Sequence, residues 1–261
     1  MRSGLQAFLI VVAVCYGLII GSFLNAWVWR LTHGEKITAG RSHCPKCGAQ
    51  IRAYDNVPLV SWLLLRGRCR DCGEPISWRY PLGEAVTAAL FAAVAVMDGL
   101  SWLLVPHLLF ASALIVVSQV DLETKIIPDI VILPVAALGL PLMIVLGSAP
   151  WWQWPVAGLG AAGFLFLISE VYYRIRHAEG MGFGDVKLAL CMGVYLGPAV
   201  VPALFLGFLS GAVVGVILIG GRRGDAKTAI PFGPFLAAGA ILALFFGGAL
   251  IDAYLGLVFP S

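Results

Sequence analysis

The feature that most constrains this chain is the recurrence of long apolar runs along almost its whole length. A helix needs about 20 apolar residues to cross the roughly 30 Å of hydrocarbon in a bilayer. Such stretches occur near residues 5–29, 82–98, 101–120, 130–147, 155–175, 187–203, 204–221 and 232–258. The last division of 187–221 rests on the helix breakers Gly197-Pro198 and Pro202. The sequence therefore predicts an all-α, polytopic membrane protein with about eight transmembrane helices.

Composition supports a membrane protein and argues against a soluble one. Hydrophobic residues make up 60% of the chain and charged residues only 12%, whereas soluble domains carry about 25% charged residues. The net charge of +3 indicates no nucleic-acid partner, because the placement of Lys and Arg matters more than their sum in a membrane protein. The first apolar run is too long for the core of a cleavable signal peptide, so we expect it to remain as the first helix, within residues 1–29.

The basic residues predict an orientation. With eight spans, all of the 17 Lys and Arg residues except Arg2 fall in loops on one side of the membrane. Basic loops stay on the cytoplasmic side during insertion, so both termini are expected on the other side. Asp121 ends the third predicted span and Asp185 begins the sixth. Both acids are therefore expected at the cytoplasmic boundary.

One sizeable polar segment, residues 30–80, separates the first predicted helix from the remaining seven, which lie in residues 81–261. We interpret it as a small cytoplasmic domain. A segment this short cannot easily build a sufficient apolar core, so a covalent or metal crosslink is expected. Four of the six cysteines lie in it, and the phrase C-x-x-C-G-x-x-I occurs twice, once from Cys44 and once from Cys69.

These two phrases predict a metal site with four cysteine ligands, Cys44, Cys47, Cys69 and Cys72. A tetrahedral zinc site needs two such chelating turns, and a glycine after the second sulfur suits the tight turn. Two disulfides are the alternative, but a cytoplasmic loop lies in a reducing compartment. His43 is a further candidate ligand. Cys15 and Cys191 lie within spans and are interpreted as small buried hydrophobes.

Two carboxylates at the ends of apolar runs are the candidate catalytic residues. A carboxylate at the centre of a spanning helix costs about 2.5–3.5 kcal/mol, so such an acid is a candidate functional residue. Asp185 stands in the phrase Gly182-Phe183-Gly184-Asp185, and Asp121 precedes the helix-breaking pair Ile127-Pro128. Alternatively each acid simply ends a helix, as Glu123, Asp129 and Glu179 could. Glu84 and Glu170 are rival candidates.

If Asp121 and Asp185 face each other, they have the chemistry of an aspartic protease. Of two facing carboxyls that share a proton, the ionised one activates water and the protonated one polarises the peptide carbonyl. Gly182 and Gly184 would let an extended substrate approach, because their backbone carries no side chain.

The motifs together resemble the type IV prepilin peptidases, bifunctional membrane aspartic proteases of the G-x-G-D type and N-methyltransferases. The matching phrases occupy residues 21–25, 42–47, 56–58, 67–72, 76–82, 121–129, 182–185 and 231–234. Asp55 and Gly83 depart from the family pattern, but neither belongs to the motifs of the proteolytic site.

The resemblance implies a fold, a substrate class and cofactors. It implies an enzyme of the bacterial inner membrane that cleaves type IV prepilins and pseudopilins on the cytoplasmic side and serves a pilus or a type II secretion system. Asp121 and Asp185 match the two catalytic aspartates, and the four cysteines match a loop that binds structural Zn²⁺. The enzyme would methylate the new amino terminus with S-adenosylmethionine. This second activity rests wholly on the resemblance, because no strand with a glycine-rich cofactor loop is found.

Two other functions fit parts of the sequence. A G-x-G-D intramembrane protease could act on other substrates, although the tetracysteine segment favours the prepilin peptidases. A proton-coupled transporter would place its acids near the midplane and would show symmetry-related broken helices. We find neither feature in the sequence.

Overall fold

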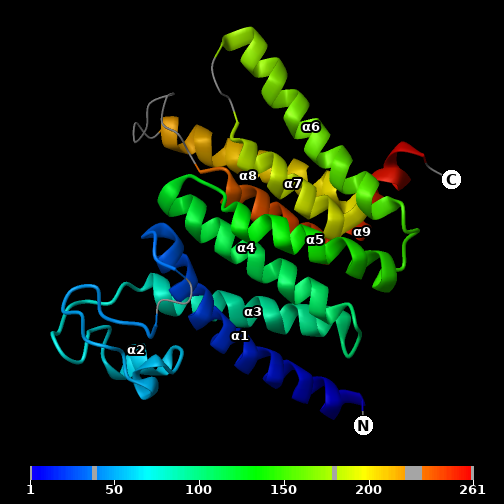
Figure 1. The fold of residues 1–261 in the computed structure, drawn as a ribbon. Coiled ribbons are helices and arrows are strands. Elements are labelled where there is room, and N and C mark those ends of the chain that lie inside the picture. The colour runs from blue at the N-terminus through cyan, green and yellow to red at the C-terminus, as the bar shows by residue number, and fades with distance from the viewer. Residues whose placement is uncertain (1, 37–39, 178–180, 221–230, 260–261) are drawn as a thin grey trace. The chain divides into compact units, whose positions relative to one another are not determined.

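The computed structural model describes residues 2–36, 40–177, 181–220 and 231–259, which form helices and connecting loops without a β-strand (Figure 1). This confirms the predicted all-α class. Contacts within the chain divide it into two compact units, Met1–Leu104 and Val105–Ser261. We refer to them as the N-terminal unit and the C-terminal unit and describe each by itself.

The N-terminal unit is built on two long helices, α1 (Arg2–Thr32) and α3 (Arg79–Asp98), that pack against each other. Glycines on α1 make this close approach possible. A Cβ at Gly17 would lie 2.6 Å from the Cα of Ala88, and one at Gly21 would lie 2.8 Å from the Cα of Glu84. The polar segment between the long helices holds two short helices, η1 and α2. The bounds of these short helices are η1 (Ala53–Asn56) and α2 (Val60–Leu64).

The C-terminal unit contains six α-helices and one short 3₁₀ helix among its described residues. The bounds are α4 (Leu104–Thr124), α5 (Asp129–Leu146), α6 (Gln153–Arg176), α7 (Phe183–Leu196), η2 (Gly197–Ala199), α8 (Val200–Gly220) and α9 (Gly233–Val258). The main helix pairs are α6 with α7, α8 with α9, and α5 with α7. Helix α7 therefore lies at the centre of the packing, and ten of its residues from Asp185 to Leu196 are buried.

One tyrosine joins three of these helices. The ring of Tyr195 on α7 stacks on that of Phe110 on α4, with centroids 4.6 Å apart. Its hydroxyl donates a hydrogen bond of 3.0 Å to the carbonyl oxygen of Val135 on α5. Gly139 leaves the space that the Tyr195 ring fills. A buried hydroxyl with a partner avoids the cost of an unmade hydrogen bond, so Tyr195 fixes α4, α5 and α7 in register.

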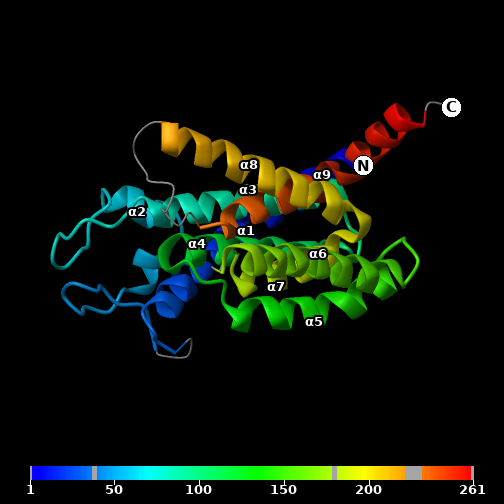
Figure 2. The same ribbon diagram turned by 90° about the horizontal axis from the view of Figure 1, so that it is seen from above.

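The spanning segments agree with the prediction of about eight helices, with one difference in the length of α7. Seven segments of the described chain are long and apolar enough to cross a membrane, and one of them, Phe183–Leu218, runs through both α7 and α8. Figures 1 and 2 show that α7 and α8 run in opposite directions. The break predicted at Gly197-Pro198 is present as η2, where Gly197 has a φ of +55°. However, α7 has only 14 residues, fewer than the roughly 20 that a full crossing needs.

Two further predictions concern cysteines and loop residues. Cys191 is buried as expected, but Cys15 is exposed on the surface of α1, because that position of the helix faces away from α3. The predicted cytoplasmic loop with Arg222, Arg223 and Lys227 lies outside the described residues, and so does Glu179.

Candidate active site and metal centre

Asp121 lies in the last turn of α4, where the helix is made to end. Lys125 takes up a left-handed backbone conformation with a φ of +57° and donates its N–H to the Asp121 carbonyl oxygen at 2.8 Å. Pro128 then caps the start of α5. The interruption predicted from Ile127-Pro128 is therefore present, and it leaves Asp121 at a helix end with only 4% of its surface exposed.

The first residue of α9 fixes the Asp121 carboxylate. The backbone N–H of Gly233 donates a 2.8 Å hydrogen bond to Oδ2 of Asp121. A Cβ at Gly233 would lie 2.9 Å from the same oxygen, closer than real Cβ contacts come. Gly233 lies in the matching phrase at residues 231–234, but its role was not predicted from the sequence. The signal was a glycine between two prolines at the start of an apolar run, where a helix begins with free N–H groups.

Asp185 lies in the first turn of α7 and is 8% exposed. Gly182 caps this helix, and the helix dipole favours an acid in the first turn. At Gly184 a Cβ would lie 2.8 Å from Cβ of Ile127. Gly184 therefore lets the start of α7 pack on the loop between α4 and α5. At Gly182 the nearest atom to an added Cβ is Oδ2 of Asp185, at 3.5 Å. That substrate approaches either glycine stays a prediction.

The structure brings the two predicted acids together. The Asp121 and Asp185 carboxyls lie close enough for the charge of one to act on the other, although the residues come from different helices. Both are buried among apolar side chains of the C-terminal unit. Mere helix ends in a headgroup region would be exposed, so this arrangement favours a functional pair.

An ion pair beside these acids was missed from the sequence. Nζ of Lys187 on α7 donates to both carboxylate oxygens of Asp129, the first residue of α5, at 2.6 and 2.7 Å. The pair ties the N-terminal parts of α5 and α7 together, two residues from Asp185. Asp129 was predicted only as a helix end, because nothing in the local pattern shows which residue faces it.

The rival acids have other surroundings. Glu170 on α6 accepts a 2.7 Å hydrogen bond from Nε of Arg174, one helical turn away, in an exposed ion pair. Glu84 belongs to the N-terminal unit, where it is buried and lines a cavity. Glu170 is thus paired with an arginine, and Glu84 lines a cavity in the other unit.

The four predicted cysteine ligands converge in the N-terminal unit. The sulfur atoms of Cys44, Cys47, Cys69 and Cys72 all lie within 4.8 Å of one another. Cys44 and Cys72 are 3.9 Å apart, far from the roughly 2.05 Å of a disulfide. A set of four sulfurs at this spacing fits a tetrahedral metal ion. His43 packs its ring edge on Trp29 and is not part of the cluster.

The repeated phrase folds into two matching turns. The N–H of Gly48 donates to the Cys44 carbonyl at 2.9 Å, and that of Gly73 donates to the Cys69 carbonyl at 3.0 Å. Both glycines have a φ just above +70°, which glycine adopts without strain. The N–H groups of Cys47 and Lys46 lower the pKa of the Cys44 thiol to about 7, whereas burial and the neighbouring cysteines raise the pKa of the Cys72 thiol to about 12.

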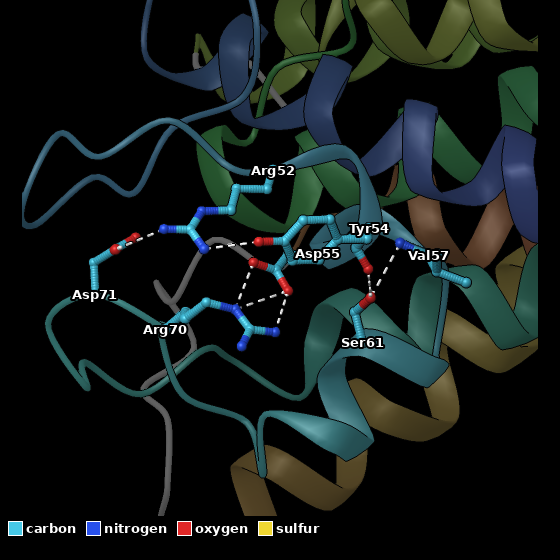
Figure 3. A network of polar contacts seen from close by, with 7 residues as sticks. All are labelled: Arg52, Tyr54, Asp55, Val57, Ser61, Arg70 and Asp71. Atoms are coloured by element: carbon cyan, nitrogen blue, oxygen red, sulfur yellow. Dashed lines mark hydrogen bonds and ion pairs between the residues drawn. The ribbon is translucent and has the colours of Figure 1, made fainter.

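A polar network fastens the loop next to this cluster (Figure 3). Nε and Nη2 of Arg70 donate to the two carboxylate oxygens of Asp55 at 2.8 and 2.6 Å. This hydrogen bonding holds the pKa of Asp55 below its usual range. The Arg70 guanidinium also lies 5.5 Å from the centre of the Tyr54 ring. The ion pair of Asp55 with Arg70 thus secures the segment beside the cysteine cluster.

Family models match both parts of the chain. A model described as the bacterial peptidase A24 N-terminal domain matches residues 15–97, and one described as the type IV leader peptidase family matches residues 108–219. Together with the relatives described next, these matches define the protein class. The chain belongs to the type IV leader peptidase family, a family of membrane aspartic peptidases.

Curated relatives cover nearly the whole chain. A protein of Bacillus subtilis is 37% identical over 92% of this chain and 95% of its own length. One of Burkholderia pseudomallei is 36% identical over 90% of this chain and 84% of its own length, and one of Pseudomonas aeruginosa is 34% identical over 93% and 92%. Each of these relatives is named prepilin leader peptidase/N-methyltransferase. No solved structure matches the chain.

Proposed function

We propose that this chain cleaves the leader peptide of type IV prepilins and pseudopilins and then methylates the new amino terminus with S-adenosylmethionine. Cleavage takes place at the cytoplasmic boundary of the bacterial inner membrane. The family membership and the names of the relatives support this assignment. The basic leader of a prepilin stays beside the cytoplasmic loops for the same reason that the chain's own basic residues do.

The observation that carries the proteolytic half is the buried, interacting pair of Asp121 and Asp185. The ionised member takes a proton from a water molecule as that water attacks the peptide carbonyl. The protonated member donates a hydrogen bond to the carbonyl oxygen. The C–N bond then breaks, and the leaving nitrogen takes up a proton. The products are a leader carboxylate and a free amino terminus.

Neighbouring groups hold the pair in position. The Gly233 N–H fixes one oxygen of Asp121, which leaves the other for water or substrate. The side of Gly182 that would carry a Cβ is free of close contacts, so an extended substrate backbone can come near Asp185. Gly184 supports this arrangement indirectly, because its close approach to Ile127 sets the start of α7 against the loop between α4 and α5.

The cysteine cluster holds Zn²⁺ in this proposal. Four thiolates complete a tetrahedral shell and leave no open position for substrate, so the metal acts structurally. It crosslinks the two turns of a segment that is too short for a core of its own. Metal analysis of the purified protein tests the identity of the ion: one zinc per chain is expected, and iron or no metal contradicts the assignment.

The function is tested by mass spectrometry of a prepilin incubated with the purified protein in lipid, with and without S-adenosylmethionine. We expect loss of the leader in both cases and an additional methyl-sized mass only with the donor. Failure to cleave several prepilins, combined with cleavage of other membrane helices, would favour a G-x-G-D protease of different specificity.

The pH dependence of cleavage tests the carboxyl pair. Coupled carboxyls titrate in two macroscopic steps, and only the singly protonated pair is active. The rate should therefore rise and fall with pH between two apparent pKa values. A rate that is independent of pH across both the acidic and the neutral range contradicts the mechanism.

A further inference from the structure

A cavity in the N-terminal unit has no role in the cleavage described above. Its volume is about 380 Å³, within the roughly 300–1,000 Å³ of small-molecule sites. It lies among the C-terminal end of α1, the cysteine loops, α2 and the start of α3. Among its lining residues are Asn25, Trp29, Asp55, Trp62, Tyr80 and Glu84. Because every lining residue lies between Ser22 and Glu84, the cavity belongs to this unit alone.

The chemically distinctive residue of the cavity is Glu84. Glu84 is only 8% exposed. Its Oε2 accepts a 2.8 Å hydrogen bond from the N–H of Leu59. The structure records no basic partner for Glu84 within the residues it describes. Burying a carboxylate without a positive partner is costly, so a bound cation would stabilise this site.

The other acids that line the cavity already have partners. Asp55 is held by Arg70 at 2.6 Å, Asp71 lies 3.9 Å from Arg52, and Glu74 lies 4.0 Å from Lys46. The two guanidinium groups and their acids form one network with Tyr54 (Figure 3). A positive ligand therefore meets one lining acid that lacks a basic partner within the described chain.

A strained turn presents the amide to Glu84. Leu59 has a φ of +59° and a ψ of −49°, and the N–H of Val60 reaches back to the Pro58 carbonyl at 2.6 Å. These values describe a γ-turn of the rare, strained kind. Such strain persists where the surrounding structure enforces it, often at ligand clamps. Here it points the Leu59 N–H at a buried carboxylate.

The position of Glu84 is set by packing of α1 on α3. Gly21 admits the backbone of Glu84 so closely that a Cβ there would lie 2.8 Å from its Cα. One turn further along α1, Nδ2 of Asn25 donates to the Tyr80 carbonyl at 2.8 Å. These contacts explain the role of the phrase Gly21 to Asn25: it brings Glu84 to the wall of the cavity.

Two indole rings supply apolar walls. Nε1 of Trp62 donates to the Ile76 carbonyl at 3.1 Å, and the ring packs over Gly67. Trp29 is braced by His33, which stacks on it with centroids 4.5 Å apart. Aromatic faces stack on nucleic-acid bases and attract cations.

We infer that this cavity binds S-adenosylmethionine, with the Glu84 carboxylate receiving a positive group of its methionine part. The donor combines an adenine ring with a sulfonium and an ammonium group and one carboxylate, and so carries a net positive charge. Aromatic walls with one buried acid that has no basic partner in the described chain fit that combination. The inference rests on the proposed methyltransferase activity and assigns a site to it.

The test is direct binding of radiolabelled S-adenosylmethionine to the full-length protein in lipid nanodiscs, measured by equilibrium dialysis. Glu84→Gln keeps an oxygen acceptor for the Leu59 N–H but removes the charge. We expect it to bind roughly tenfold more weakly or worse, as for the loss of a charged hydrogen-bond partner. The matched control is Glu170→Gln, which removes an acid paired with Arg174 in the C-terminal unit and should bind like the wild type.

Leader cleavage by the same samples checks that each variant is folded. Equal binding by wild type and Glu84→Gln would overturn the assignment of the donor to this cavity. It would not contradict the proposed methyltransferase activity. A wild type that cleaves prepilin but neither binds the donor nor methylates its product overturns the methyltransferase half of the proposed function as well. The two failures are thus distinguishable.

A second measurement avoids variants altogether. Ultraviolet irradiation crosslinks bound S-adenosylmethionine to nearby aromatic residues, and peptide mass spectrometry locates the adduct. We expect it between residues 22 and 84, suppressed by excess S-adenosylhomocysteine. A competable adduct confined to the C-terminal unit would contradict the inference.

Discussion

The two units hold their polar groups by different means. In the N-terminal unit, charged side chains lie in loops between helices and are fixed by ion pairs, a strained turn and a cysteine cluster. In the C-terminal unit, Asp121 and Asp185 are buried among packed helices, and a backbone N–H from α9 fixes one oxygen of Asp121. The chemistry of the N-terminal unit should therefore depend on how well its loops are ordered. The chemistry of the C-terminal unit should depend on how its helices pack. Disturbing one unit should spare the activity of the other.

The largest expected effect follows from removing either acid of the C-terminal unit. Asp121→Asn and Asp185→Asn cannot exchange a proton at that position, so cleavage should fall by about 10²–10⁴-fold, the usual contribution of general acid–base catalysis. Methylation of a pilin supplied without its leader should continue. Timed mass spectrometry of the products measures both.

The control for these variants is Asp252→Asn, which changes an exposed acid on α9. Its cleavage rate should equal that of the wild type. Rapid cleavage by either Asp121→Asn or Asp185→Asn would remove that residue from the mechanism.

The next effect concerns the metal and the opposite unit. Cys72→Ser breaks the ligand set, so residues 40–80 should exchange amide hydrogens faster and methylation should be lost. Leader cleavage should decline much less. Hydrogen exchange and product analysis on one preparation check this.

Cys15→Ser serves as the matched control, because Cys15 is an exposed cysteine of the same unit outside the cluster. It should leave exchange and both activities unchanged. If Cys72→Ser behaves in the same way, the cluster does not organise the loop.

A smaller effect is expected at the start of α9. Gly233→Ala would force a Cβ to within 2.9 Å of Oδ2 of Asp121, and overpacking of this kind costs about 1–3 kcal/mol. Cleavage should fall roughly tenfold, since each 1.4 kcal/mol is a factor of ten. Initial cleavage rates provide the measurement.

Gly248→Ala, on the same helix but with open space around its Cβ, should cleave normally. Equal rates for the two alanine variants would show that the contact between Gly233 and Asp121 is unimportant for catalysis.

The smallest effect is expected at the ion pair beside the acids. Lys187→Met breaks its contacts with Asp129, and partly exposed pairs contribute about 0–1 kcal/mol. Cleavage should slow up to about fivefold through a shifted start of α7. Arg174→Met breaks the exposed pair with Glu170 and should have no effect. If Arg174→Met cleaves prepilin more slowly than Lys187→Met does, this interpretation is contradicted.

Local sequence patterns predicted much of both sites. The repeated C-x-x-C-G phrase predicted two matching turns, because glycine just after the second sulfur permits the left-handed backbone that the turn needs. Ile127-Pro128 predicted the break after Asp121, and Gly197-Pro198 predicted that between α7 and α8. Each of these follows from the backbone preference of one or two neighbouring residues.

The features that the sequence did not predict depend on contacts between distant segments. The hydrogen bond from Gly233 to Asp121 joins residues 112 positions apart, and that from Leu59 to Glu84 depends on a strained turn that no propensity favours. The boundary between α7 and α8 was predicted at 203–204, a few residues too late, because hydropathy alone does not place a helix end within a continuous apolar run; α7 ends at Leu196. The exposure of Cys15 was not predicted, because a membrane helix is apolar on its exposed face as well as on its buried face.

The most direct test of the division between the units is one crossed assay. Wild type, Asp185→Asn and Glu84→Gln are each given an intact prepilin and a pilin without its leader, with S-adenosylmethionine at a concentration near its dissociation constant for the wild type, and the products are weighed by mass spectrometry. We predict that Asp185→Asn methylates the second substrate without cleaving the first, and that Glu84→Gln cleaves the first while methylating poorly. Loss of both activities in each variant would contradict the division, and cleavage by Asp185→Asn would contradict the catalytic pair.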